Sequence, residues 1–382
     1  MWYLKVDTLL LMLTCGVVFV LADHLLRRFA PEKRLTPWLL VLDMVVLLYV
    51  SWELAVFYAL YTVFSWGLTR LMGKIKTGRK FWFVALCIAD LLPFFYARLA
   101  GFFPALPTIF VLVGFSYNML KAVDGLFYVY YAEEPVDFWV YSNFMLFFPV
   151  ITGGPIFRYR DFAKFYRAPK PATAEVSLDC AKRFIRGMFK KLVLAAVVQQ
   201  LLNRVLQMSS HFYVSGALAV LSYLVLYFDM AGYSDIAISL GTFMGVPVPE
   251  NFKQPWTAAS FTQFWRKWHV TLSDWIREHI FVVVGGKRLN RYVAATIGLC
   301  TMLVMSLWHE FDLMALGTGL YMGFFLVVEN LFGWTTADKR KTPKALYTFR
   351  CLAVNGLFAI NAMFFTMNGT QLLQAVRGFF RL

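Results

Sequence analysis

The sequence predicts an all-α, polytopic membrane protein, and both its composition and the spacing of its apolar residues support this class. Hydrophobic residues make up 60% of the 382 residues and aromatic residues 18%, whereas charged residues make up only 15%. Soluble domains average about 45–50% apolar and about 25% charged residues. The composition therefore excludes an ordinary soluble domain and indicates that most of the chain lies in lipid.

Apolar runs that could cross a bilayer occur along the whole chain. A helix needs about 20 mainly apolar residues to cross the hydrocarbon, and several runs here are shorter, which favours tilted, broken or re-entrant helices. No cleavage site is evident near the first run, so we expect it to be a retained helix. We expect about ten or eleven transmembrane or re-entrant helices in one membrane domain, residues 1–382. The candidate runs are 9–26, 38–49, 54–68, 81–96, 107–120, 138–156, 184–206, 212–228, 292–308, 313–328 and 352–367.

The formal charge of +15 is concentrated between these runs. The positive-inside rule predicts that such basic loops are cytoplasmic, and the largest basic cluster extends from Arg158 to Lys191. Between residues 99 and 157 the only basic residue is Lys121, so the topology of that part stays open. Since no basic soluble module is present, we expect no nucleic-acid partner. We therefore expect a multi-pass protein located in the cell (cytoplasmic or inner) membrane.

One histidine, His309, lies between two apolar runs, residues 292–308 and 313–328. An ionisable side chain in that position is expensive unless it faces a protein interior or a water-filled cavity, which makes it a functional candidate. The alternative is an interfacial histidine at a helix end, where an amphipathic ring costs little. Position alone leaves both interpretations open.

Residues 229–256 break the alternation of apolar run and loop. Pro247, Pro249 and Pro255 lie within nine residues and cannot continue a helix. Asp229 and Asp235 flank Gly232, where we expect a bend. Irregular backbone near the membrane must be buried in protein or line a wet cavity, so we favour a cavity lining over a plain loop.

Residues 260–280 show the pattern of an amphipathic helix, with apolar residues at spacings of three and four and Ser260 as the expected N-cap. Such a helix lies in the interface or re-enters the membrane surface. The alternative is a simple interfacial anchor. His269 argues against that alternative because it lies beside Trp268 and one turn before Ser273.

Spacing excludes several kinds of chemistry. Position 313 is Leu, so the His309-Glu310 pair is not a zinc-protease motif. His269 and His279 are ten residues apart, which on one helix separates them by ~80° and ~15 Å, too far to share a metal. The five cysteines are scattered and predict neither a disulfide framework nor a metal site. A histidine base that deprotonates a hydroxyl for attack on an activated acyl carbon fits what remains.

Six short elements together resemble the membrane-bound O-acyltransferase family. They follow the family's order over residues 150–312, which we expect to hold the catalytic core. The elements are 153–159 (GGPIFRY), 228–238 (FDMAGYSDIAI), 249–252 (PENF), 264–273 (FWRKWHVTLS), 275–278 (WIRE) and 307–309 (LWH).

The resemblance implies a helical body that encloses a tunnel through the bilayer, with His309 as general base at its constriction. It implies His269 as the second catalytic histidine, which supports the tunnel or the acceptor side. It also implies no permanently bound cofactor. The co-substrate would be a cytoplasmic acyl thioester, either acetyl-CoA or a phosphopantetheinyl carrier protein. The residues that would form the tunnel and substrate site are Asp229, Tyr233, Ser234, Asp235, Asn251, Trp265, Arg266, Trp268, Ser273, Arg277 and Trp308.

Two bacterial branches of the family compete. Residues 285–288 (GGKR) are similar to an element of the alginate-type subunits that O-acetylate exported polysaccharides, whereas the length is closer to that of the teichoic-acid D-alanylation protein. Glu310 and the Ile276-Arg277-Glu278 run depart from both branches. We favour polysaccharide O-acetylation. A non-enzymatic transporter of an envelope precursor is the competing class, although no inverted repeat is visible, and an inactive scaffold is disfavoured by the intact His309.

The resemblance also suggests partners. These are the lipid bilayer, an acyl-CoA or acyl carrier protein, an extracytoplasmic acyltransferase or other polymer-modifying protein, and a cell-envelope polymer. The basic stretch 158–191 either obeys the positive-inside rule alone or also docks the acidic donor, because clustered cations attract such partners. The candidate docking residues are Arg158, Arg183 and Arg186.

Overall fold

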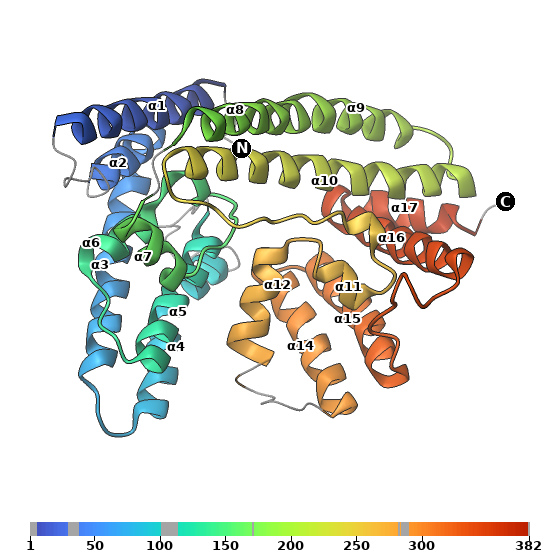
Figure 1. Ribbon diagram of the computed structural model, residues 1–382. Helices are drawn as coiled ribbons and strands as arrows, with labels where there is room; N and C mark the ends of the chain where they lie inside the picture. Colours follow the sequence, from blue (N-terminus) through green and yellow to red (C-terminus); the bar gives the residue numbers. More distant parts are fainter. Residues whose placement is uncertain are drawn as a thin grey trace. The chain divides into compact units, whose positions relative to one another are not determined.

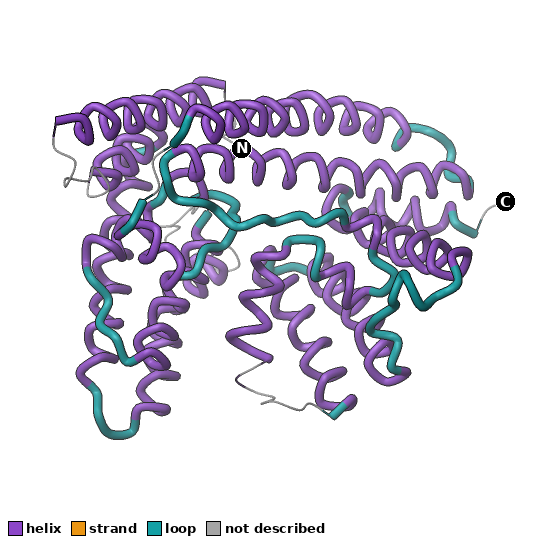
Figure 2. Tube along the Cα trace, viewed as in Figure 1, coloured by secondary structure: helices purple, strands orange, loops and turns teal. Residues whose placement is uncertain are grey.

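The computed structural model describes residues 6–29, 38–100, 114–169, 172–281, 283 and 290–380. The described part is 80% helical and contains no strand (Figures 1 and 2). Packing divides the chain into two compact units. The first comprises Met1–Phe184 with Asp235–Pro249, and the second comprises Ile185–Ser234 with Glu250–Leu382. The expected all-α membrane fold is therefore confirmed.

Seven helices within the described ranges are long and apolar enough to cross a membrane. The shorter apolar segments Leu39–Val50 and Phe138–Val150 add to them. A multi-pass membrane protein is thus confirmed, while ten or eleven spans stay a prediction. The seven helices are α1 (Val6–Phe29), α3 (Trp52–Lys74), α4 (Arg79–Ala100), α10 (Phe212–Phe243), α14 (Arg291–His309), α15 (Leu313–Phe332) and α16 (Lys344–Thr366).

The first unit is built on α1 to α4, and its core is rich in aromatic rings. Phe144 packs edge-to-face on Tyr159, with ring centroids 5.6 Å apart, and contacts Phe162 at the same distance. The remaining elements of this unit are α2 (Leu39–Val50), α5 (Phe115–Ala132), α6 (Phe138–Leu146), the 3₁₀ turn η3 (Phe148–Val150), α7 (Tyr159–Arg167) and most of α8 (Ala174–Met188).

Two buried ionisable side chains hold the break between α6 and η3 in the first unit. Phe147 leaves the helical conformation there, with φ −47° and ψ 102°. The Lys121 ammonium donates to the Met145 carbonyl at 2.8 Å, and an Asp43 carboxylate oxygen accepts from the Phe148 N–H at 2.9 Å. A helix break away from water leaves backbone groups that need such partners. Lys121 is therefore a buried structural residue and carries no information about which loops are cytoplasmic.

Helix α10 corrects one expectation. It runs unbroken from Phe212 to Phe243, so the bend predicted at Gly232 is wrong. Gly232 is instead a point of close approach, because a Cβ there would lie 2.8 Å from the Lys191 backbone nitrogen and 2.9 Å from the Gly187 carbonyl oxygen. Lys191 belongs to a π-helical turn, η4 (Phe189–Leu194). The irregular segment predicted from the prolines begins only after α10.

The second unit holds a further correction. The continuous amphipathic helix expected over residues 260–280 is wrong, because His269 adopts a left-handed conformation with φ +47° and interrupts it. The predicted N-cap is confirmed, since the Ser260 hydroxyl accepts from the Gln263 N–H at 3.0 Å. The interrupted elements are α11 (Phe261–Trp265), α12 (Val270–Ile276) and the π turn η6 (Arg277–Phe281).

Helices α14 and α15 of the second unit pack closely through glycines. A Cβ on Gly319 would lie 2.9 Å from the Leu303 Cα, and one on Gly323 would lie 2.4 Å from the side chain of Leu299. Small residues allow membrane helices to approach in this way. The unit is completed by α9 (Ala195–Val205), α16, the 3₁₀ turn η5 (Pro255–Thr257) and α17 (Gly369–Gly378).

Candidate active site

Asn251 is the centre of a buried polar network in the second unit. It follows the proline-rich segment and is only 1% exposed. Its amide nitrogen donates to the Ser234 hydroxyl on α10 at 3.2 Å. Its amide oxygen lies 3.1 Å from Nδ1 of His269 and accepts from the Thr271 hydroxyl at 2.9 Å. Three of the recognised motifs, 228–238, 249–252 and 264–273, thus meet at one side chain.

His269 is held by its backbone as well. Its carbonyl oxygen accepts from the N–H groups of Leu272 and Ser273, both at 3.1 Å, and so begins α12. The left-handed conformation is uncommon for a residue other than glycine, although histidine is among the residues that adopt it more often. Such conformations cluster at functional sites. The side chain is 3% exposed and lies outside the seven candidate spans.

Aromatic side chains surround Trp268, the residue before His269. Trp268 stacks on Phe264 with centroids 5.6 Å apart and meets Phe252 edge-to-face at 5.0 Å. Phe358 of α16 and Tyr223 of α10 contact the same indole at 4.8 and 5.6 Å. The wall beside His269 is therefore apolar and rigid, and a group that reaches the imidazole is shielded from water on that side.

His309 ends α14 and is half-buried. The ring of Trp308 meets it edge-to-face with centroids 4.5 Å apart, and Phe365 of α16 approaches it at 6.4 Å. Trp308 itself is buried, with 7% exposure. His309 is thus the last residue of its helix, and aromatic rings contact it inside the second unit.

The two histidines influence each other electrostatically. The pKa of His269 is lowered to about 3, mainly by burial and to a smaller extent by the charge that His309 can carry. His269 is therefore neutral near pH 7. Two imidazoles coupled in this way do not readily hold two protons at once. A neutral, buried imidazole and a second imidazole in the same unit suit acid–base chemistry.

Glu329 of α15 holds the start of α11 and was not singled out from the sequence. Its carboxylate accepts from the N–H groups of Phe261 and Thr262 at 2.5 and 2.9 Å, and from the Thr262 hydroxyl at 3.0 Å. The Arg350 guanidinium binds the neighbouring Ala259 carbonyl at 2.9 Å. A carboxylate at a helix N-terminus satisfies free N–H donors and complements the helix dipole. These bonds fix the short helix that leads to His269.

The acidic residues of the 228–238 element are each held by a basic residue. Within the second unit Lys191, 2% exposed, contacts Asp229 at 2.5 Å, and its ammonium lies over the Tyr233 ring. Within the first unit Arg183 contacts the buried Asp235 at 2.9 Å. Asp229 and Asp235 are therefore structural anchors on α10, whatever else they contact. The pairing of Lys191 with Asp229 was not predicted, because the two residues are 38 positions apart in the sequence.

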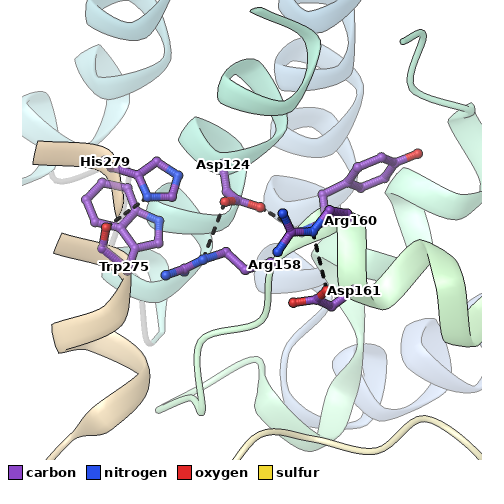
Figure 3. Close-up of polar contacts among 7 residues, drawn as sticks. Asp124, Arg158, Arg160, Asp161, Trp275 and His279 are labelled. Carbon is purple, nitrogen blue, oxygen red and sulfur yellow. Dashed lines mark hydrogen bonds and ion pairs between the residues drawn. The ribbon is translucent and has the colours of Figure 1, made fainter. Parts of the chain in front are cut away.

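The 153–159 element of the first unit is held by Asp124 of α5. Its carboxylate accepts from the Tyr159 N–H at 2.6 Å and lies 3.9 Å from Nε of Arg158 (Figure 3). Arg158 and Arg183 both form ion pairs, and the Arg186 side chain on α8 is exposed. Of the three candidate docking residues, Arg186 presents its side chain most openly.

Three of the predicted tunnel residues lie near the surface of α11 to η6. Arg266 and Arg277 are exposed, with Arg277 paired to Asp274 at 2.9 Å, and Ser273 is half-buried. On the same segment His279 stacks on Trp275 and bonds the Trp275 carbonyl at 2.9 Å (Figure 3). Trp265 is half-buried. Residues 285–288 lie outside the described residues.

Comparison with known proteins adds to this geometry. Residues 36–367 match the model of the MBOAT, membrane-bound O-acyltransferase, family. The chain is 31% identical to the probable alginate O-acetylase AlgI of Pseudomonas fluorescens, over 60% of this chain and 47% of that protein. It is 28% identical to the teichoic acid D-alanyltransferase of Bacillus subtilis, over 70% and 73% of the two chains. It is 28% identical to the peptidoglycan O-acetyltransferase of Helicobacter pylori, over 54% and 40%. The chain spans about half the length of the alginate relatives that it matches.

Proposed function

Because this chain belongs to the membrane-bound O-acyltransferase family, we propose that it is an acyltransferase of the cytoplasmic membrane that O-acetylates an exported cell-envelope polysaccharide. The observation that carries this proposal is the buried His269, whose ring is held by the Asn251 amide in the same packed unit as His309. The relatives named for alginate and peptidoglycan O-acetylation support the choice of a polysaccharide acceptor.

The proposed reaction is transfer from a thioester. His309 takes the proton of the acceptor hydroxyl as its oxygen attacks the acyl carbon. The carbon–sulfur bond then breaks, and the thiolate takes the proton back from the imidazolium. An ester and a free thiol result. A positioned base of this kind contributes about 10²–10⁴-fold to rate. His269, which burial keeps neutral, does not compete for that proton.

A second candidate is D-alanyl transfer from a carrier protein. One observation favours it: the match to the Bacillus subtilis D-alanyltransferase covers 73% of that protein, against 47% for the alginate relative. The chemistry at the thioester is the same, so the donor distinguishes the two. Docking of either donor would use exposed cations of α8, and charge reversal at the exposed Arg186 tests this.

The test is label transfer by the purified protein in nanodiscs. Acetyl-CoA or D-alanyl carrier protein, each labelled in the acyl group, is supplied together with envelope polymer and extracytoplasmic partner extract. Wild type should transfer label from acetyl-CoA, and His309→Ala should not. His24→Ala, an exposed histidine of α1, is the matched control and should behave as wild type. Label only from the carrier protein would select the second candidate. Equal transfer by His309→Ala would refute the general base, and no transfer from either donor would favour a transporter.

A further inference from the structure

The orientation of the Asn251 amide is fixed by its neighbours. The backbone N–H of Thr271 points to Oδ1 at 3.4 Å, and a backbone nitrogen can only donate. The atom that it meets must therefore be the oxygen, and the other amide atom, the nitrogen, donates to the Ser234 hydroxyl at 3.2 Å. If the amide were rotated by 180°, its NH₂ group would face the Thr271 N–H, and two donors would oppose each other.

Backbone hydrogen bonds on both sides of Asn251 hold its side chain in this arrangement. The Val270 N–H donates to the Asn251 carbonyl at 2.9 Å, and the Lys253 N–H donates to the Lys267 carbonyl at 2.8 Å. Residues 251–253 and 267–270 are thus joined at two points on either side of the amide. Because Asn251 is 1% exposed, water is not available to replace a lost partner.

This geometry determines where the proton of His269 lies. Nδ1 of His269 is 3.1 Å from Oδ1 of Asn251, and an amide oxygen has no hydrogen to donate. The hydrogen bond therefore requires a hydrogen on Nδ1. A neutral imidazole has one N–H, so Nε2 carries the lone pair. The partner of one ring nitrogen commonly sets the tautomer of a functional histidine in this way.

We infer that Asn251 is a positioning residue that fixes His269 in the Nδ1-protonated tautomer, so that Nε2 of the ring carries the lone pair. The role in the reaction rests on the proposed acyl transfer; the tautomer does not. An Nε2 acceptor is suited to a group that donates, the hydroxyl of a sugar acceptor or the amide N–H of a pantetheine arm. It is unsuited to holding an oxyanion, which needs a donor.

The direct test observes the tautomer by solid-state NMR in lipid on protein labelled with ¹⁵N in its five histidines. The His269 signals are identified by their loss in His269→Gln. Wild type should show the proton on Nδ1 and the lone pair on Nε2. Asn251→Ala should move the proton to Nε2, whereas Asn251→Asp, which keeps an oxygen acceptor, should leave it on Nδ1. A proton on Nε2 in wild type, or no change in Asn251→Ala, would overturn the inference.

Kinetics separate positioning from a merely structural role. Asn251→Ala should lower kcat by about 10–100-fold, as for other groups that orient a functional histidine, with little change in the KM for the donor. Asn251→Asp should recover part of kcat and shift the acid limb of the pH–rate profile upward, because a carboxylate favours the protonated ring. His309 is the other titratable group that acts on this ring. The matched control is Asn361→Ala, which removes another buried asparagine of the same unit, on α16.

The outcomes distinguish the two proposals. Loss of kcat in Asn251→Ala with the proton still on Nδ1 would reduce Asn251 to a structural residue and overturn the inference. Failure of wild type to transfer any acyl group, with the NMR result as expected, would refute the proposed function and leave the tautomer assignment standing. An equal loss of kcat in Asn361→Ala and Asn251→Ala would also contradict a positioning role for Asn251.

Discussion

The two units of the molecule bury polar side chains for different purposes. In the first unit, Lys121 and Asp43 bond backbone atoms at the break between α6 and η3. In the second unit, Asn251 bonds another side chain, the imidazole of His269, and Glu329 fixes the helix that precedes it. Ionisable residues are expensive in both places. In the first unit these side chains bond backbone atoms, whereas in the second unit Asn251 also orients an imidazole.

This difference shows that burial of a charged residue in a membrane protein does not by itself identify a site. Lys121 is 1% exposed and Asp43 is not exposed at all, so by burial alone they would outrank the half-buried His309. The two regions differ in what each buried polar group bonds, either a backbone atom or another side chain. When a buried group bonds a backbone carbonyl or N–H, this structural role is enough to explain why it is buried. A group that orients an imidazole points to chemistry.

The largest expected effect on stability is in the first unit. Lys121→Met removes the ammonium, leaves the Met145 carbonyl without its donor and removes the charge that acts on Asp43. Leaving a buried backbone acceptor without its donor costs about 1–3 kcal/mol, which should appear as a lower Tm in nanodiscs. The double variant Lys121→Met with Asp43→Asn should recover part of the loss. A single variant as stable as wild type would contradict the structural role of Lys121.

The second prediction concerns pH and the second unit. The pKa of His269 is lowered from 6.5 in the unfolded chain to about 3 in the fold. Between these values the unfolded state binds a proton that the folded state does not, so stability rises with pH across this window and is lost on acidification. The slope is at most about 1.4 kcal/mol per pH unit. Thermal unfolding from pH 4 to 7 should show a flatter profile for His269→Gln. Identical slopes would refute the buried neutral ring.

A smaller effect is expected at the contact of α10 with η4. Gly232→Ala introduces a Cβ 2.8 Å from the Lys191 backbone nitrogen, and overpacking of this kind costs about 1–3 kcal/mol. The control is on the same helix: a Cβ at Gly216 meets nothing within 4 Å. Gly216→Ala should be neutral or stabilising by about 1 kcal/mol, because alanine favours helix. Equal Tm values for the two variants would rule out the close approach.

The smallest effect is expected from Glu329→Gln. The amide keeps one oxygen for the α11 N-terminus but loses the charge, so stability should fall by about 0.5–2 kcal/mol, the range for a weakened helix cap. Arg350 also binds this region, so the fold should persist. The sharper readout is the His269 ¹⁵N signal, which should broaden as α11 loosens. An unchanged signal would separate Glu329 from the site.

Local patterns in the sequence predicted some features well. The apolar runs predicted a helical membrane protein, Ser260 was a correct N-cap, and the motif order predicted the family. Contacts across long sequence separations were missed. Lys191 and Glu329 lie 38 and 67 residues from their partners, and no local pattern indicates such pairs. The left-handed His269 was missed because tertiary bonds from Asn251 impose it against the helical pattern. Gly232 was misread because a glycine at a close packing contact and one at a bend look the same in sequence.

The measurement that tests the central claim compares acyl transfer per folded molecule for His309→Ala and for the Lys121→Met, Asp43→Asn double variant in the same nanodiscs. We predict that His309→Ala keeps the wild-type Tm and loses about 10²–10⁴-fold in rate. The double variant should lose stability and keep a rate close to that of wild type. An active His309→Ala, or a double variant that is folded but inactive, would contradict the assignment of chemistry to the second unit and of structure to the first.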